Sequence, residues 1–273
     1  MPMLRETALA PPTPSLAPME WTVVSRENYR YAHGGSLNGP PLILVHGLFG
    51  ALSNWGHTLA YMGDRYHVYV PLLPIYEVSP VEPSLAGLTQ YLQDFFTGEG
   101  LPPAVWIGNS LGGHLALLLA RSHPQHFRAL VLTGSSGLFE EGMGSTFPRR
   151  SSYEFVAERV AYTFYDPAQA TPELVQEVYE IVNDNYKALR VLKIAREAQR
   201  SFVAPWLHEI NIPTALIWGL NDTITPVNVA YGFYRMLPRA KLYFIDACGH
   251  APMMEQPEAF HAHLTQFLQE VPV

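Results

Sequence analysis

The segment from Val105 to His114 constrains this chain more than any other, because it reads as a strand, a tight turn and the start of a helix. The turn has the pattern Gly-x-Ser-x-Gly, with Gly108 and Gly112 on either side of Ser110. Glycines there permit a strained backbone and a close approach of strand and helix. Such a turn exposes the serine side chain, and the N–H of Leu111 then lies at a helix N-terminus, where it can stabilise a developing oxyanion. We therefore expect acyl-transfer chemistry through Ser110.

The composition is that of a globular protein able to bury a large core, with 273 residues, 48% of them hydrophobic and 15% charged. A formal net charge of −7 argues against a nucleic-acid partner or an anionic membrane surface. The single cysteine, Cys248, excludes an internal disulfide and provides no zinc-binding pattern. We expect a small-molecule substrate and no metal, and the sequence leaves the oligomeric state open.

Residues 1–18 include Pro11, Pro12, Pro14 and Pro18, and we expect them to form a flexible leader. They lack the basic start and the continuous apolar core of a secretion signal. Nowhere in the sequence do eighteen apolar residues follow one another, so we expect no membrane span. A single cysteine fits a reducing compartment. Together these features predict a cytoplasmic protein.

Strand-like and helix-like segments alternate from about residue 20 onward, and the first two strands are expected to form an antiparallel pair. This alternation predicts an α/β fold, with a mostly parallel, doubly wound sheet and helices on both faces. Strands are predicted at 21–25, 28–32, 41–46, 66–71, 104–109, 129–133, 214–218 and 241–245, and helices at 55–64, 84–96, 111–122, 227–236 and 257–268.

The alternation of strands and helices stops between about residues 147 and 205, where the apolar residues have helical spacing and no strand is predicted. Thr171 is a predicted N-cap, with Pro172 at the first helical position. Inserted between two strands, this segment would lie over Ser110, because ligands bind at the carboxyl ends of the strands in open α/β sheets. We therefore predict a helical cap. The predicted boundaries are 139–205 for the cap and 19–138 with 206–273 for the core.

Aromatic side chains recur at helical spacing in the predicted cap, and we expect some to pack the cap and others to line an apolar acyl or aryl pocket. They are Phe155, Tyr162, Phe164, Tyr165, Tyr179 and Tyr186. Three polar residues near the motifs are expected to have packing or turn-forming roles instead of chemical ones. They are His46, His114 and Cys248.

A second oxyanion donor is predicted in the turn His46-Gly47-Leu48, which directly follows the strand 41–46. This glycine-bearing turn can aim the N–H of Leu48 at the same place as the N–H of Leu111. Two donors matter, because the loss of one such contact typically costs about 3–4 kcal/mol of transition-state stabilisation.

An acid and a base are predicted in the last third of the chain, each on a loop that follows a strand. Asp222 follows the strand 214–218, and its carboxylate can orient a histidine and stabilise the imidazolium form. His250 lies between Gly249 and Pro252, and its imidazole can take the Ser110 proton and return it to the leaving group. The loop 133–137 holds no carboxylate that could replace Asp222.

The order Ser110, Asp222, His250 and the motifs around these residues resemble the α/β-hydrolase superfamily, and specifically its capped, cofactor-free members. The resemblance runs from about residue 20 to the C-terminus and implies that no metal or organic cofactor is needed. The chain departs from the family after residue 70, where Pro71 to Glu77 replaces an Asp-x-x-Gly-x-Gly turn. That departure is expected to affect the substrate and leave the chemistry unchanged.

The resemblance implies a serine hydrolase, with a carboxylic ester as the first expected substrate. Two alternatives stay open at this stage. One is a carbon–carbon hydrolase of vinylogous diketo acids, which would need a cationic group such as Arg149, Arg150 or Arg190. The other is a ligand-binding homologue without catalytic activity. The sequence leaves the natural substrate and its acyl length open.

Overall fold

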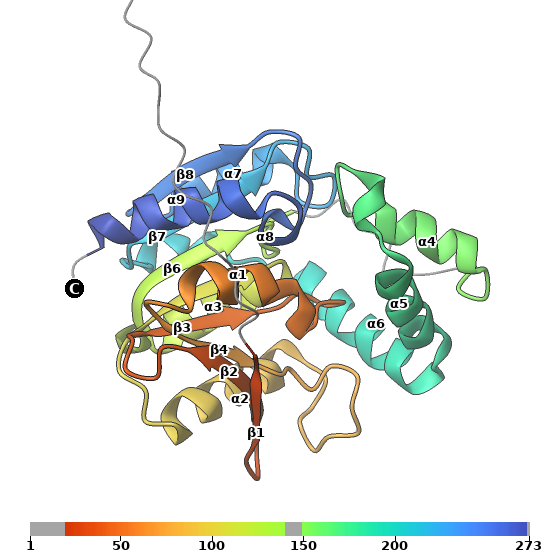
Figure 1. Ribbon diagram of the computed structural model, residues 1–273, viewed down its shortest axis with the longest axis horizontal. Coiled ribbons are helices and arrows are strands. Elements are labelled where there is room, and N and C mark those ends of the chain that lie inside the picture. The colour runs from red at the N-terminus through yellow and green to blue at the C-terminus, as the bar shows by residue number, and fades with distance from the viewer. Residues whose placement is uncertain (1–19, 140–148, 272–273) are drawn as a thin grey trace, which may run out of the picture.

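The computed structural model describes residues 20–139 and 149–271 (Figure 1). The predicted leader, and residues 140–148 of the predicted cap, lie outside the described residues. Within these ranges eight strands form one sheet in the order β1-β2-β4-β3-β5-β6-β7-β8. The strands are β1 Thr22–Ser25, β2 Arg30–Gly35, β3 Pro41–Val45, β4 His67–Pro71, β5 Ala104–Asn109, β6 Phe127–Thr133, β7 Thr214–Gly219 and β8 Ala240–Ile245.

Strand pairing changes from antiparallel to parallel across the sheet. β2 pairs antiparallel with both β1 and β4, and all pairs from β4 to β8 are parallel. The central strands β3, β5 and β7 are buried along their whole length, as expected for parallel strands covered on both faces. The predicted α/β fold with a mostly parallel sheet is therefore confirmed.

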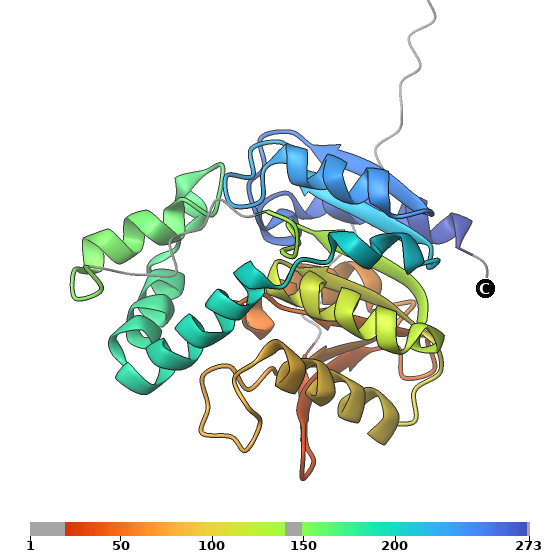
Figure 2. The ribbon, with the colours of Figure 1, turned by 180° about the vertical axis from the view of Figure 1, so that it is seen from behind.

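Helices cover both faces of the sheet. Ile43 of β3 packs in one hydrophobic cluster with residues of α2, α3 and α7, while its neighbour Leu42 packs in a second cluster with residues of α1 and α9. Successive strand residues point to opposite faces, so one strand contributes to both cores. Figures 1 and 2 show the two layers from opposite sides. The helices are α1 Gly56–Met62, α2 Leu85–Gly98, α3 Leu111–Ser122, α7 Val227–Met236 and α9 Pro257–Glu270.

Three further helices connect β6 to β7 and lie to one side of the sheet in both views (Figures 1 and 2). They are α4 Tyr153–Ala161, α5 Pro172–Asn183 and α6 Asn185–Arg200. Thr171 caps α5 through its side chain, and Pro172 begins the helix, as predicted. Asp184 then ends α5 and caps α6 by accepting hydrogen bonds from the N–H groups of Tyr186 and Lys187.

The short helix α8 (Pro252–Glu255) and the separation of α5 from α6 were not anticipated from the sequence. Short 3₁₀ turns also occur, at Leu52–Trp55, Pro124–His126, Pro167–Gln169 and Ala204–Glu209. None of the helices in the described ranges is both long enough and apolar enough to cross a bilayer.

Candidate active site

Ser110 stands on the turn between β5 and α3, with φ of 54° and ψ of −120°. The close packing around this turn leaves no space for a side chain at Gly108 or Gly112. A Cβ atom on Gly108 would lie 2.5 Å from the Cα of Gly113, and one on Gly112 would lie 2.1 Å from the carbonyl oxygen of Val45. The predicted strand, tight turn and helix are therefore present, and the positive φ places a strained serine at the carboxyl end of the sheet.

Asp222 and His250 come from the loops after β7 and β8, and both are buried. The Nδ1 of His250 donates a hydrogen bond to the Oδ2 of Asp222 at 2.9 Å. Thr225 donates its hydroxyl to the same oxygen at 2.8 Å, while Oδ1 accepts the N–H groups of Ile224 and Thr225, both at 2.9 Å. These hydrogen bonds fix both oxygens of the carboxylate. Because Nδ1 carries the proton that it donates to Asp222, the other ring nitrogen, Nε2, is the basic one.

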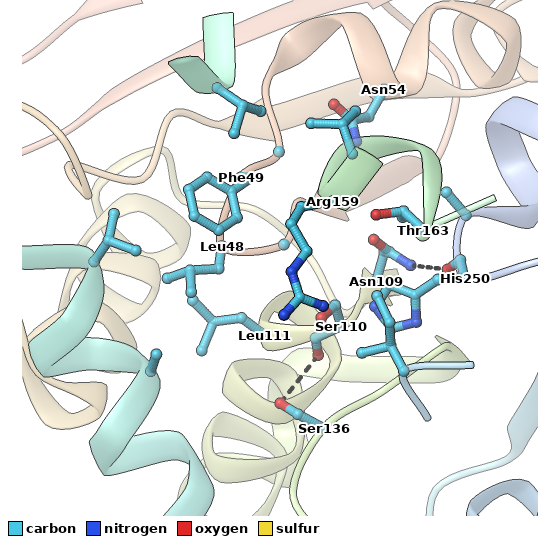
Figure 3. Close-up of a pocket in the computed structure, with 18 of the residues that line it drawn as sticks. Leu48, Phe49, Asn54, Asn109, Ser110, Leu111, Ser136, Arg159, Thr163 and His250 are labelled. Carbon is cyan, nitrogen blue, oxygen red and sulfur yellow. Dashed lines mark hydrogen bonds between the residues drawn. The ribbon is translucent and has the colours of Figure 1, made fainter. Parts of the chain in front are cut away.

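The His250 backbone is held by two other parts of the molecule. Its N–H donates to the carbonyl oxygen of Thr163 at 2.9 Å, and its carbonyl accepts from the side-chain amide of Asn109 at 3.0 Å (Figure 3). Asn109 also donates to the carbonyl oxygen of Thr133 at 3.1 Å. The residue before Ser110 therefore links the ends of β5 and β6 to the histidine loop.

The turn after β3 lies close to Ser110, since a Cβ atom on Gly47 would be 3.1 Å from the Cβ of Ser110. In the described part of the chain, no hydrogen bond engages the N–H of Leu48 or of Leu111. The carbonyl oxygen of Leu48 accepts a hydrogen bond from the hydroxyl of Tyr76. Burial raises the pKa of Tyr76, so its hydroxyl keeps its proton and acts as a donor.

A cavity of about 330 Å³ opens above these groups (Figure 3). Four of the sequence-predicted site residues line it, namely Leu48, Ser110, Leu111 and His250. The fifth, Asp222, lies behind His250 and is reached through the hydrogen bond to Nδ1.

Some of the aromatic residues of this segment were expected to line the pocket, and one of the six does. Of the six aromatic residues considered, Phe164 lines the cavity, whereas Tyr162, Tyr165 and Tyr186 are exposed at the surface. Aliphatic side chains of α4, α5 and α6 form most of the wall on the side of these helices, because the helices turn their buried stripes toward the cavity. They include Val160, Leu174, Val178, Val182, Ala188, Val191, Leu192, Ala195 and Ala198.

The three residues expected to have packing roles are all buried. His114 lies between two hydroxyls, with Nδ1 3.3 Å from Ser136 Oγ and Nε2 3.2 Å from Ser201 Oγ. Burial lowers its pKa to about 4, so the ring is neutral at pH 7. His46 donates to the carbonyl oxygen of Gly47 at 2.9 Å, and burial raises the pKa of the Cys248 thiol.

The candidate cationic residues have different surroundings. Arg190 is buried and donates to the carbonyl oxygens of the loop after β4, at Pro74, Ile75 and Val81. It is therefore engaged in holding this loop against α6. Arg150 lines the cavity, while Arg149 is exposed and does not line it.

Sequence reasoning assigned no role to four side chains around the site, namely Tyr76, Arg159, Thr225 and Glu255. Glu255 is buried and accepts two backbone N–H groups, from Gly249 at 2.6 Å and from Asp166 at 2.7 Å. It thereby connects the histidine loop to the segment after α4. Thr225 stands three residues after Asp222, a spacing that favours side-chain to backbone bonding in turns and could have pointed to it.

Among the described residues, no group of three His, Cys, Asp or Glu side chains could hold a metal ion.

Comparison with known proteins identifies the family. The model of the alpha/beta hydrolase family matches residues 42–263, and the chain belongs to this family. An alpha/beta hydrolase enzyme from the metagenome of sediments from the lagoon of Mar Chica, Morocco, is 37% identical with a TM-score of 0.74, covering 91% of this chain and 98% of that one.

Two further relatives extend this likeness. Lipase 1 of Psychrobacter immobilis is 26% identical, over 86% of this chain and 78% of its own length. A 2-hydroxy-6-oxo-6-(2'-aminophenyl)hexa-2,4-dienoic acid hydrolase of Metapseudomonas resinovorans is 29% identical, over 88% of this chain and 87% of its own. The chain is accordingly a hydrolase of the α/β type.

Proposed function

We propose that this hydrolase cleaves carboxylic esters through an acyl-enzyme on Ser110, with His250 as the base and Asp222 as the orienting acid. The observation that carries the proposal is the 2.9 Å hydrogen bond between His250 Nδ1 and Asp222 Oδ2, at a cavity that Ser110 also lines. This arrangement supports the proposed roles of nucleophile, base and orienting carboxylate for three side chains from distant segments.

In the proposed first step, the Nε2 of His250 takes the proton of Ser110 while the Oγ attacks the ester carbonyl. The N–H groups of Leu48 and Leu111 stabilise the resulting oxyanion. Protonated His250, stabilised by Asp222, then gives the proton to the departing alkoxide, and the alcohol leaves. In the second step His250 activates water, which releases the acid and restores Ser110.

The helices α4, α5 and α6 are proposed to act as a cap that selects the substrate. They supply the aliphatic wall of the cavity, while the core supplies the reactive groups. The cavity of about 330 Å³ is at the lower end of the range of small-molecule sites, so a small to medium ester with an apolar acyl part is the proposed substrate.

The test uses purified protein, short-chain para-nitrophenyl esters and a fluorophosphonate probe. The intact protein is expected to hydrolyse the esters and to take up the probe covalently. The Ser110→Ala variant is expected to lose both, and the Ser122→Ala variant, altered on the other end of α3, is expected to keep both. An intact protein that neither hydrolyses an ester nor takes up the probe would instead be a ligand-binding homologue.

A second candidate is carbon–carbon bond hydrolysis of a vinylogous diketo acid. The observation that favours it is the 29% identity to the dienoic acid hydrolase over 88% of this chain. The same preparation should therefore be assayed with such a diketo acid. If its kcat/KM exceeds that of every ester tested, this candidate replaces ester hydrolysis.

A further inference from the structure

The charges around the cavity are unbalanced. Arg150 and Arg159 line it, and none of its lining residues in the described part of the chain is an aspartate or a glutamate. A cation beside apolar walls loses hydration, and this loss is compensated when an anion occupies the same space. The lining is thus suited to a ligand with a negative charge.

Arg159 is the residue whose guanidinium is available for such a ligand. It stands near the end of α4 and is half-buried, and its side chain extends into the cavity toward Ser110 (Figure 3). Its guanidinium carbon lies 5.5 Å from the centre of the Phe155 ring. Within the ranges that the structure covers, no carboxylate forms an ion pair with Arg159, and no acceptor forms a hydrogen bond with it.

The neighbouring arginines differ in this respect. Arg150 donates to the carbonyl oxygen of Val182 at 3.1 Å and to the side-chain oxygen of Asn185 at 2.6 Å. Arg190 is engaged by the carbonyl groups of the loop after β4. These two guanidinium groups hold backbone and helix ends in place, whereas the donors of Arg159 face the cavity.

We propose that Arg159 is an anion subsite, and that the substrate of this hydrolase carries a carboxylate in addition to the bond that Ser110 attacks. This inference rests on the proposed function of Ser110. The planar guanidinium matches a carboxylate through two parallel hydrogen bonds, so it fixes orientation as well as charge. The apolar wall from α5 and α6 then accommodates the carbon chain between the carboxylate and the reacting carbonyl.

The test compares two esters with the same number of acyl carbons, the mono-para-nitrophenyl ester of glutaric acid and para-nitrophenyl pentanoate. The intact protein is expected to favour the acidic ester in kcat/KM. In Arg159→Ala, kcat/KM for the acidic ester should fall about 10- to 100-fold, the range for a lost hydrogen bond to a charged group, while the value for pentanoate changes little. Arg159→Lys should retain part of the preference, because lysine keeps the positive charge but cannot form the two parallel hydrogen bonds of a guanidinium.

Arg196→Ala is the matched control, because Arg196 is exposed on α6, does not line this cavity, and its removal changes the net charge equally. This variant is expected to keep the preference for the acidic ester. Free glutarate should compete with the acidic ester more strongly than inorganic phosphate does. Stronger inhibition by phosphate would overturn the assignment to a carboxylate.

The outcomes separate this inference from the proposed function. If the intact protein turns over both esters equally, and Arg159→Ala affects them equally, the anion subsite is wrong and the ester hydrolase stands. If the intact protein turns over neither ester, the proposed function fails. Calorimetric binding of glutarate to Ser110→Ala protein, with and without Arg159→Ala, then tests the subsite alone, and equal binding by the two would overturn it.

Discussion

Gly134 lies directly against the imidazole of His250, since a Cβ atom at residue 134 would be 2.7 Å from Nδ1. Gly134 has a φ of +53° and follows β6, so the loop passes beneath the histidine in a conformation that favours glycine. The same ring nitrogen donates to Asp222. Any side chain at residue 134 would therefore compete with the contact that orients His250.

The variant Gly134→Ala is expected to lower kcat for ester hydrolysis about 100-fold, the effect of displacing a reacting group by about 1 Å. An alanine held at this positive φ also costs about 1 kcal/mol of folding free energy. Gly100→Ala separates the two effects, because Gly100 has a φ of +60° and nothing within 4 Å of the added Cβ. Gly100→Ala should show the loss in the free energy of unfolding that comes from the positive φ alone, with unchanged kcat. Equal kcat values in the two variants would contradict the proposed role of the His250 position.

The variant Asp222→Asn is expected to lower kcat about 1,000- to 10,000-fold with little change in KM. An amide in place of the carboxylate can donate to Nδ1, which favours the wrong tautomer and removes the charge that stabilises imidazolium. Steady-state kinetics on a para-nitrophenyl ester measures the effect. Asp246→Asn, in the loop after β8, is the control for the loss of one carboxylate, and it should behave as the unaltered protein does.

Much of the fold follows from the sequence, because long buried strands and tight glycine turns are local patterns. The helix after Ser110 is predicted with the bounds 111–122 that α3 has. Thr171 is predicted from local chemistry as the N-cap residue of the helix that follows it. The separation of α5 from α6 was missed, since Asp184 reads as one more polar residue in a helical stretch. Its capping role depends on the direction of the next helix, which local pattern does not specify.

The candidate site, like the fold, could be predicted from the sequence only in part. The expected acid and base lie within hydrogen-bonding distance, as the loop positions suggested. The partners of Arg190 could not be read from the sequence, because they are backbone carbonyls more than a hundred residues away. Arg159 was missed because its position on α4 has meaning only once α4 is placed against the core. Long-range packing, and not residue type, decides which arginines line the cavity.

Tyr76 is expected to position Leu48, the proposed oxyanion donor, because its hydroxyl donates to the carbonyl oxygen of that residue. The variant Tyr76→Phe should lower kcat about 10-fold, the effect of one hydrogen bond, with KM unchanged. Affinity for a boronic acid that mimics the tetrahedral intermediate should fall in parallel, while affinity for the product acid stays constant.

Tyr91→Phe is the control for a purely structural hydroxyl. Tyr91 bonds the backbone of Arg30 and Leu72, away from the cavity. This variant should lower the melting temperature and leave kcat and boronic acid affinity unchanged. If Tyr76→Phe shows the same pattern as Tyr91→Phe, the hydroxyl of Tyr76 contributes to stability alone.

Two buried histidines are expected to make the folded state less stable in acid. Burial lowers the pKa of His114 and of His261 to about 4, whereas the ordinary value is 6.5. Between these pH values the unfolded chain binds more protons than the folded one, so the free energy of unfolding falls as pH decreases from 6.5 to about 4 and levels off below. Each histidine can contribute about 3 kcal/mol to this loss.

The variant His114→Gln removes one titrating group and keeps a side chain that can bond the hydroxyls of Ser136 and Ser201. Urea unfolding at pH 7, 5.5 and 4.5 should show a shallower loss of stability than in the unaltered protein, by up to about 3 kcal/mol at the lowest pH. His208→Gln, altered at an exposed position, should keep the original slope. Because the two variants remove the same chemical group, a shared slope would mean that His114 is charged in the folded protein and that burial does not hold it neutral.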